Sequence, residues 1–174
     1  MNAVKTLVVG VALSLAALAP SSWAAPAPGA PDAVQVKAVQ DMLAAMQAEK
    51  MMRATASASR YSSEAQRKSV MDKLARIAPA QIYQRLAAPV AKIVATDTAV
   101  ELTRLYSSSY GQKLLQQKYN SGPSMFPAQE PQATPAEKKE LKRAETIKAR
   151  KALVAAEPAI EHEAFVLLAA IIKH

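Results

Sequence analysis

Hydrophobic residues recur every three or four positions along most of this chain, which is the spacing of helices that bury one face. A first helix is predicted to begin after Asp32, a favourable N-cap residue, and to carry an apolar face of Val36, Val39, Leu43, Met46 and Met51. We expect Met42, Met46, Met51 and Met52 to fill the core. A soft-metal site or an adaptable binding surface is the alternative for these methionines, but no histidine or cysteine joins the set.

Three further helices are predicted between residues 62 and 106. One begins near Ser62 or Ser63 and buries Val70, Leu74 and Ile77, until Pro79 ends it and opens the next. That next helix points Ile82, Leu86, Val90 and Ile93 inward, and Pro89 should kink it. The last of the three runs from a cap at Thr96 or Asp97 through Val100, Leu102 and Leu105 to Tyr106.

The C-terminal part follows a stretch, residues 120–134, that is rich in proline and glycine. The run Thr134-Pro135-Ala136-Glu137 predicts a helix start with a capping box. The helix after it has a thin apolar stripe of Leu141, Ala144, Ile147 and Val154, and Pro158 is expected to begin a final helix. Because residues 165–172 are apolar on every side, we expect them to bury in the core, with an interface to another molecule as the alternative.

The N-terminus predicts export. Lys5, an apolar run from Leu7 to Leu18 and the small residues Ser22 and Ala24 have the layout of a cleaved signal peptide with its cut after Ala24. A run of this length is shorter than the ~20 residues that span a bilayer. The chain has no cysteine, so the periplasmic or secreted protein that we expect must be stable through its core alone.

These segments divide the chain into a signal peptide (1–24), a flexible leader (25–32), a helical body (33–119), the Pro/Gly-rich connection (120–134) and C-terminal helices of the same domain (135–174). Four glycines and abundant Ala, Leu, Lys, Gln and Glu favour helix over sheet. We therefore predict an all-α single domain of about six helices in an antiparallel bundle-like array.

The most specific motif is the run from Leu105 to Leu115, Leu-Tyr-Ser-Ser-Ser-Tyr-Gly-Gln-Lys-Leu-Leu. It resembles the signature Phe-Tyr-x-Ser-Pro-x-Gly-x-Lys-Leu-Leu of a family of small secreted bacterial helical proteins that is known only as a domain of unknown function. Tyr106, Ser108, Gly111, Lys113, Leu114 and Leu115 match in register, whereas Leu105 and Ser109 replace its aromatic residue and its proline. The resemblance covers about 25 residues, from Pro89 to Leu115, and implies an exported helical fold rather than an activity.

The residues of this motif are interpreted as a structural corner between two helices. Ser108 can cap the second helix, and Gly111 in its first turn lets another backbone approach closely. No histidine or carboxylate within the run could activate a serine, so we assign no catalytic residue. We also assign no metal or cofactor, since Glu161, His162 and Glu163 are adjacent on a helix and point in different directions.

A basic segment near the C-terminus is the second candidate site. Its cations are Lys138, Lys139, Lys142, Arg143, Lys148, Arg150 and Lys151. One interpretation is a solvated face stabilised by ion pairs four residues apart. The other is a patch for an acidic partner, which would be a protein, anionic lipid or cell-wall polymer.

Two function classes remain open from the sequence. The net charge of +8 would suggest nucleic acid in a cytoplasmic protein, but predicted export and the absence of a recognition motif argue against it. We expect a non-enzymatic exported interaction protein, which could form a homodimer. A periplasmic hydrolase with a dispersed site is the alternative; convergent polar groups with perturbed ionisation in a cleft would favour it.

Overall fold

The computed structural model describes residues 30–120 and 130–173. The predicted signal peptide, most of the leader and residues 121–129 of the connection lie outside the described residues. The described chain is all-helical, as predicted, and contains eight helices. They are α1 (Ala33–Ala45), α2 (Ala48–Ala58), α3 (Glu64–Arg76), α4 (Pro79–Ala91), α5 (Thr96–Ser107), α6 (Ser109–Asn120), α7 (Pro135–Leu141) and α8 (Ala144–Lys173).

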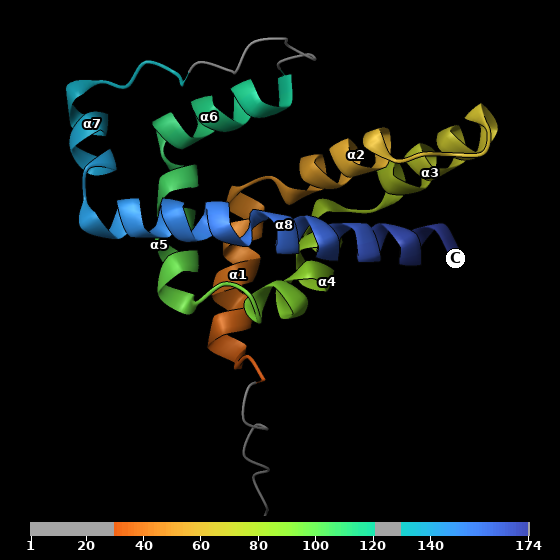
Figure 1. The fold of residues 1–174 in the computed structure, drawn as a ribbon, viewed down its shortest axis with the longest axis horizontal. Coiled ribbons are helices and arrows are strands. Elements are labelled where there is room, and N and C mark those ends of the chain that lie inside the picture. Colours follow the sequence, from red (N-terminus) through yellow and green to blue (C-terminus); the bar gives the residue numbers. More distant parts are fainter. Residues whose placement is uncertain (1–29, 121–129, 174) are drawn as a thin grey trace, which may run out of the picture.

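The helices cross one another instead of forming the antiparallel bundle that we predicted. In Figure 1, α2 and α3 form an antiparallel hairpin, α1 and α5 run in the perpendicular direction, and α8 extends across the molecule. α1 packs mainly on α4 and α5, while α8 contacts α2, α3, α4, α5 and α7. The longest helix therefore joins both ends of the molecule.

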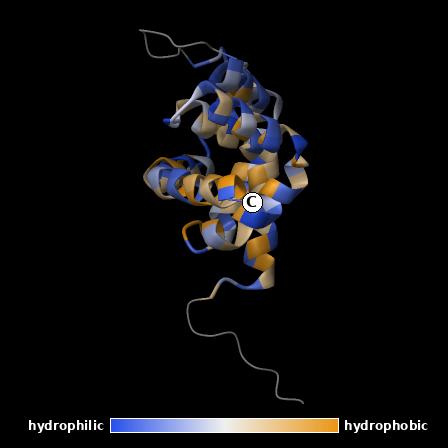
Figure 2. Ribbon diagram, turned by 90° about the vertical axis from the view of Figure 1, so that its right-hand side faces the viewer, coloured by the Kyte–Doolittle hydropathy of each residue, from blue (hydrophilic) through white to orange (hydrophobic). Residues whose placement is uncertain are grey.

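The core lies where these helices meet, and hydrophobic residues are concentrated there in Figure 2. Met42, Leu43, Met52, Leu86, Leu102 and Leu168 are among its fully buried side chains. Met46 and Met51 pack against the same cluster from its edge. The four methionines thus lie in or against the core, which agrees with the core-filling interpretation.

Several helix starts follow from the local sequence. The side chains of Asp32, Ser63 and Thr134 accept hydrogen bonds from backbone amides in the first turns of α1, α3 and α7, and Thr134 and Glu137 form the complete capping box. Pro79 occupies the first turn of α4. The start of α5 differs from the prediction, because Ala95 is its N-cap and no side chain caps the helix there.

The predicted first helix is two helices, because Gln47 has a left-handed backbone with φ 54°. This residue interrupts the helical ladder, and the chain changes direction so that Ala48 and Met52 of α2 also reach the core. The spacing of hydrophobic residues is similar on both sides of the break, so this spacing alone predicts one continuous helix. The interruption is one reason why the count exceeds six.

One proline, Pro158, acts differently from the prediction. Pro158 lies inside α8 and does not begin a helix; the break lies earlier, at Lys142 and Arg143. Proline costs a helix one backbone hydrogen bond, but burial of α8 on both sides of Pro158, at Ala149 and Ile160, offsets that loss. Pro89 lies near the end of α4, which continues to Ala91.

Val100 of α5 is exposed. One expectation about burial was partly wrong. Within residues 165–172, Leu167, Leu168 and Ile171 belong to the core, but Phe165 and Val166 are exposed. No helix among the described residues is both long enough and apolar enough to cross a membrane.

Candidate functional site

The corner between α5 and α6 brings two backbones into close approach at Gly111. A Cβ atom built on Gly111 would lie 2.1 Å from the carbonyl oxygen of Leu105 and 2.5 Å from the Cα of Tyr106. Ser108 lies between the helices, where its Oγ donates to the Leu105 carbonyl at 2.6 Å and accepts from the Gly111 amide at 3.1 Å. Only a residue without a side chain fits at position 111 in this geometry.

The other motif residues contact the core or α7. Tyr106 packs against the core, and burial raises the pKa of its hydroxyl. Leu115 is buried and Leu114 is half-buried. Lys113 points away from the core and reaches Glu137 of α7, with Nζ to Oε1 at 3.3 Å.

α7 is held on the body largely by polar contacts, and none of its residues is buried. Glu137 accepts from the Ser109 hydroxyl at 2.7 Å in addition to its contact with Lys113. Its hydrogen bond from the Thr134 amide is the main reason that the pKa of Glu137 is lowered to about 2. The carboxylate therefore stays ionised and keeps α7 attached to α6.

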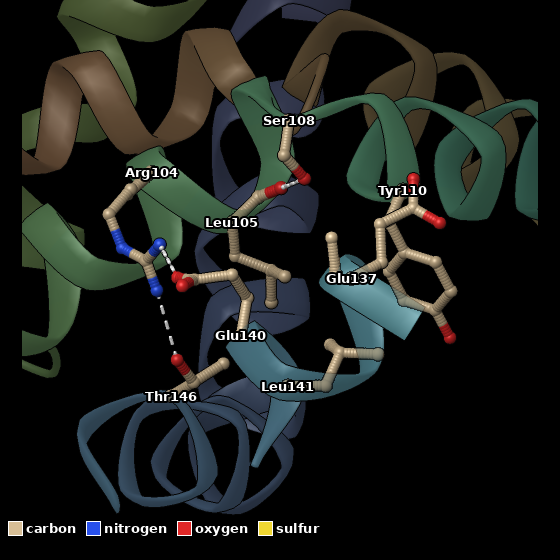
Figure 3. A pocket seen from close by; sticks show the side chains of 9 residues that line it. Arg104, Leu105, Ser108, Tyr110, Glu137, Glu140, Leu141 and Thr146 are labelled. Atoms are coloured by element: carbon tan, nitrogen blue, oxygen red, sulfur yellow. Dashed lines mark hydrogen bonds and ion pairs between the residues drawn. The ribbon is translucent and has the colours of Figure 1, made fainter. Parts of the chain in front are cut away.

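A second set of polar contacts joins α5 to α7 and α8, and Figure 3 shows its centre at Arg104. The Arg104 guanidinium binds Glu101 and Glu140, in each case at 2.6 Å, and donates to Thr146 Oγ1 at 3.1 Å. Thr146 is buried in α8 and donates in turn to Glu101 at 2.5 Å. Hydrogen bonding to Arg104 is the main cause that lowers the pKa of Glu101 to about 2.

A cavity of about 170 Å³ lies beside these contacts, between α5, α6, α7 and α8. Its lining residues are Arg104, Leu105, Ser108, Tyr110, Ala136, Glu137, Glu140, Leu141 and Thr146, and Figure 3 shows Leu105 and Leu141 on its apolar side. Tyr110 is buried and donates from its hydroxyl to Glu130 at 3.2 Å. The cavity is thus mainly apolar, with paired charges at its border.

The two carboxylates at the border of the cavity are weak bases. The pKa values of Glu137 and Glu140 are both lowered, by hydrogen bonding, and a general base near neutral pH needs a pKa near neutrality. Ser108 is engaged with backbone groups, and the Ser109 hydroxyl donates to Glu137, which is a weak base. Within residues 30–120 and 130–173, no group of three or more His, Asp or Glu side chains could hold a metal ion.

The seven predicted basic residues, which we call the basic arm, extend over α7, the turn after it and the first half of α8 (Lys138, Lys139, Lys142, Arg143, Lys148, Arg150 and Lys151). Arg143 pairs with Glu140 at 3.4 Å and Glu145 at 3.7 Å, and Arg150 pairs with Glu130 at 2.7 Å. The five lysines are exposed and make no ion pair in the described parts of the chain. The arm therefore lacks the ladder of pairs four residues apart that a merely solvated face would use.

The sequence analysis missed the polar contacts that position the arm. Glu101 and Arg104 are three residues apart on one helix, which is a visible pairing signal. Their partners Glu140 and Thr146 lie more than 35 residues further along the chain, and no spacing rule connects them. Comparison of the chain with protein-family models, with curated proteins and with solved structures found no match.

We predict that the corner does not tolerate even one added methyl group. Gly111→Ala should lower the free energy of unfolding by ~1–3 kcal/mol, because the new Cβ meets backbone atoms that cannot rotate away. Ser108→Ala should cost ~1 kcal/mol through loss of the cap. Gln116→Ala, on the exposed side of α6, is the matched control and should be nearly neutral. Urea denaturation measures all three, and an unchanged midpoint for Gly111→Ala would contradict the close approach.

A second prediction concerns acid stability. The pKa of Glu101 is about 2 in the folded protein and is ordinarily 4.5, so its contribution is present above pH 4.5 and is lost as the pH falls toward 2. Glu101→Gln should therefore be less stable than the parent at neutral pH, by ~1–3 kcal/mol, and the difference should shrink toward pH 2. Glu64→Gln, at an exposed pair, is the control. A difference independent of pH in urea denaturation would show that ionisation of Glu101 does not matter.

Proposed function

We propose that this chain is a non-enzymatic, exported helical interaction protein that binds an acidic partner through the basic arm. The observation that carries the proposal is the set of five exposed lysines on α7, the turn after it and α8, which make no ion pair within residues 30–120 and 130–173. Four lysines elsewhere in the described residues are paired with carboxylates, among them Lys37 with Asp41 at 2.5 Å and Lys68 with Asp72 at 2.7 Å. Because the lysines of the arm are not neutralised locally, their potentials add, and they attract anions.

The attachment of α7 supports a preorganised surface. Glu140 pairs with Arg104 of α5, and Glu137 contacts Ser109 and Lys113 of α6. These contacts hold α7 in place. The acids of α7 are thereby directed toward the body, while Lys138, Lys139 and Lys142 remain exposed. A surface fixed before binding loses less entropy on association than a mobile one.

The hydrolase alternative is less well supported. The cavity beside α7 and the hydrogen bond between Ser109 and Glu137 are the features that favour it. The lowered pKa of Glu137 opposes it, since this carboxylate is a weak base. The same contacts are explained by attachment of α7.

Export is the part of the proposal with the simplest test. We predict that the protein recovered from the periplasm or the culture medium begins at Ala25, after cleavage of the bond between Ala24 and Ala25. Edman degradation or intact-mass analysis of that material checks the prediction. Recovery only from the cytoplasm, with residues 1–24 still attached, would contradict it.

We predict that the basic arm is responsible for binding to acidic material. The mature protein should be retained on immobilised polyglutamate at low salt and released at high salt, because exposed charges are screened over ~10 Å at 0.1 M ionic strength. Replacing Lys138, Lys139, Lys142 and Lys148 with glutamine should lower the affinity at least tenfold. The free energy of unfolding should change by only a few tenths of a kcal/mol per residue.

A control variant with the same net charge as the four-lysine variant distinguishes binding by the basic arm from binding by the overall net charge. Arg53, Arg60, Arg85 and Lys92 are exposed cations in or next to α2 and α4, so changing these four to glutamine is the matched control. The control should keep most of the affinity. If both variants lose the same affinity, net charge is sufficient and the arm has no special role; if the parent is not retained even at low salt, the proposal is wrong.

A further inference from the structure

The exposed hydrophobic residues of this protein are concentrated on one helix. Six large hydrophobic side chains are exposed among the described residues, and four of them belong to α8: Ile147 (54%), Val154 (68%), Phe165 (53%) and Val166 (49%). These four side chains lie on the same helix as Leu167, Leu168 and Ile171, which are buried in the core. α8 therefore has an apolar inner face and apolar positions on its outer side.

The outer apolar residues lie along a line. Val154 follows Ile147 by seven residues and Phe165 follows Val154 by eleven, so the first and last are five turns of 3.6 residues apart. Val166 lies beside Phe165, about 100° further round the helix. We call Ile147, Val154, Phe165 and Val166, together with Lys148 and Lys151 beside them, the outer strip of α8.

The charges next to this line are mostly positive. Lys148 and Lys151 flank it on one side, and both belong to the basic arm. Glu161 is exposed at the opposite edge, and Arg150 on that side is paired with Glu130. Where exposed apolar side chains have lysines beside them, burial at the boundary of headgroups and acyl chains and attraction to anionic lipid both favour binding to a membrane surface.

We infer that the outer strip of α8 rests on a bilayer surface that contains anionic phospholipid. Phe165, Val166, Val154 and Ile147 enter the boundary between headgroups and acyl chains, while Lys148 and Lys151 contact lipid phosphates. Lysine suits this position because its apolar stem can lie along the boundary with its ammonium group at the headgroups. This inference rests on the proposed function, since the lysines of the arm provide the electrostatic attraction, and it names the partner as a lipid surface.

A second copy of the chain fits the strip less well. A stable dimer buries ~800 Å² per partner in closely packed side chains. The strip has four large apolar side chains, and none of them lies in the ten-residue interval between Val154 and Phe165. A fluid lipid surface needs no complementary shape, so separated apolar residues and lysines between them can act together.

Tryptophan fluorescence tests the inference directly. Trp23 is the only tryptophan of the chain and lies in the predicted signal peptide, so a tryptophan placed in the mature protein gives a signal of its own. We expect the emission of the Phe165→Trp variant to shift to the blue on vesicles of phosphatidylcholine and phosphatidylglycerol, and to stay unchanged on phosphatidylcholine alone. Val100→Trp, on the exposed side of α5, is the matched control and should not shift.

Vesicle sedimentation then separates the apolar contribution from the charged one. Phe165→Ser should lower partitioning onto the anionic vesicles about tenfold, as expected when one large aromatic side chain no longer leaves water. It should leave retention on polyglutamate unchanged, because the lysines remain. Replacement of Lys138, Lys139, Lys142 and Lys148 with glutamine should lower both.

Each other outcome has a defined meaning. Retention on polyglutamate without vesicle binding, or vesicle binding that Phe165→Ser leaves unchanged, would overturn the lipid inference while the proposed function stands. Absence of retention on polyglutamate together with absence of vesicle binding would overturn both the proposed function and the lipid inference. Concentration-dependent dimerisation without vesicles, abolished by Phe165→Ser, would overturn the lipid inference and assign the strip to a second copy.

Discussion

Burial of one face of α8 is the constraint on which the rest of the structure depends. Its inner face supplies Ala149, Ile160, Ala164, Leu168 and Ile171 to the core, and it contacts helices from both ends of the molecule. A helix of 30 residues can be buried along one side only if its rotation about its own axis is fixed. That rotation decides which residues remain outside, and it leaves Ile147, Val154 and Phe165 in water.

Polar contacts determine where α7 lies relative to this helix. Arg104 is joined to α7 through Glu140 and to α8 through Thr146. Because the ionised carboxylate of Glu101 accepts from both Arg104 and Thr146, this cluster is satisfied although Thr146 is buried. The corner at Gly111 places Ser109 and Lys113 within reach of Glu137. The motif near Tyr106 therefore also helps to hold α7 in place.

The fold class and most core positions could be predicted from the sequence, because each depends on local spacing. Val70, Leu74, Ile82, Leu86 and Leu102 are buried, as their periodicity indicated. The break at Gln47 and the continuity of α8 through Pro158 could not be predicted, since in both cases tertiary packing overrides local preference. The crossing arrangement depends on contacts between distant helices, which hydrophobic periodicity does not report.

The candidate site could likewise be predicted only where it depends on local sequence. The cap at Ser108 and the capping box at Thr134 are local, and their sequence signals were sufficient. The basic arm is visible as a run of cations, but whether those cations are paired depends on where Glu130 and Glu140 lie in space. The outer strip was found only in part: Ile147 and Val154 belong to the predicted apolar stripe, but residues 165–172 look equally apolar on all sides until the rotation of α8 is known.

The central claim is that α8 presents its outer strip, on one side of the helix, to an anionic bilayer. The chain has no cysteine, so single cysteines introduced at Ile147, Val154, Phe165, Glu145 and Val100 can each carry one nitroxide label. The most direct measurement is the accessibility of these labels to oxygen and to a polar nickel complex, with and without vesicles that contain phosphatidylglycerol. The account predicts that vesicles raise oxygen access and lower nickel access at Ile147, Val154 and Phe165 only. Equal changes at all five positions, or no change at Phe165, would contradict it.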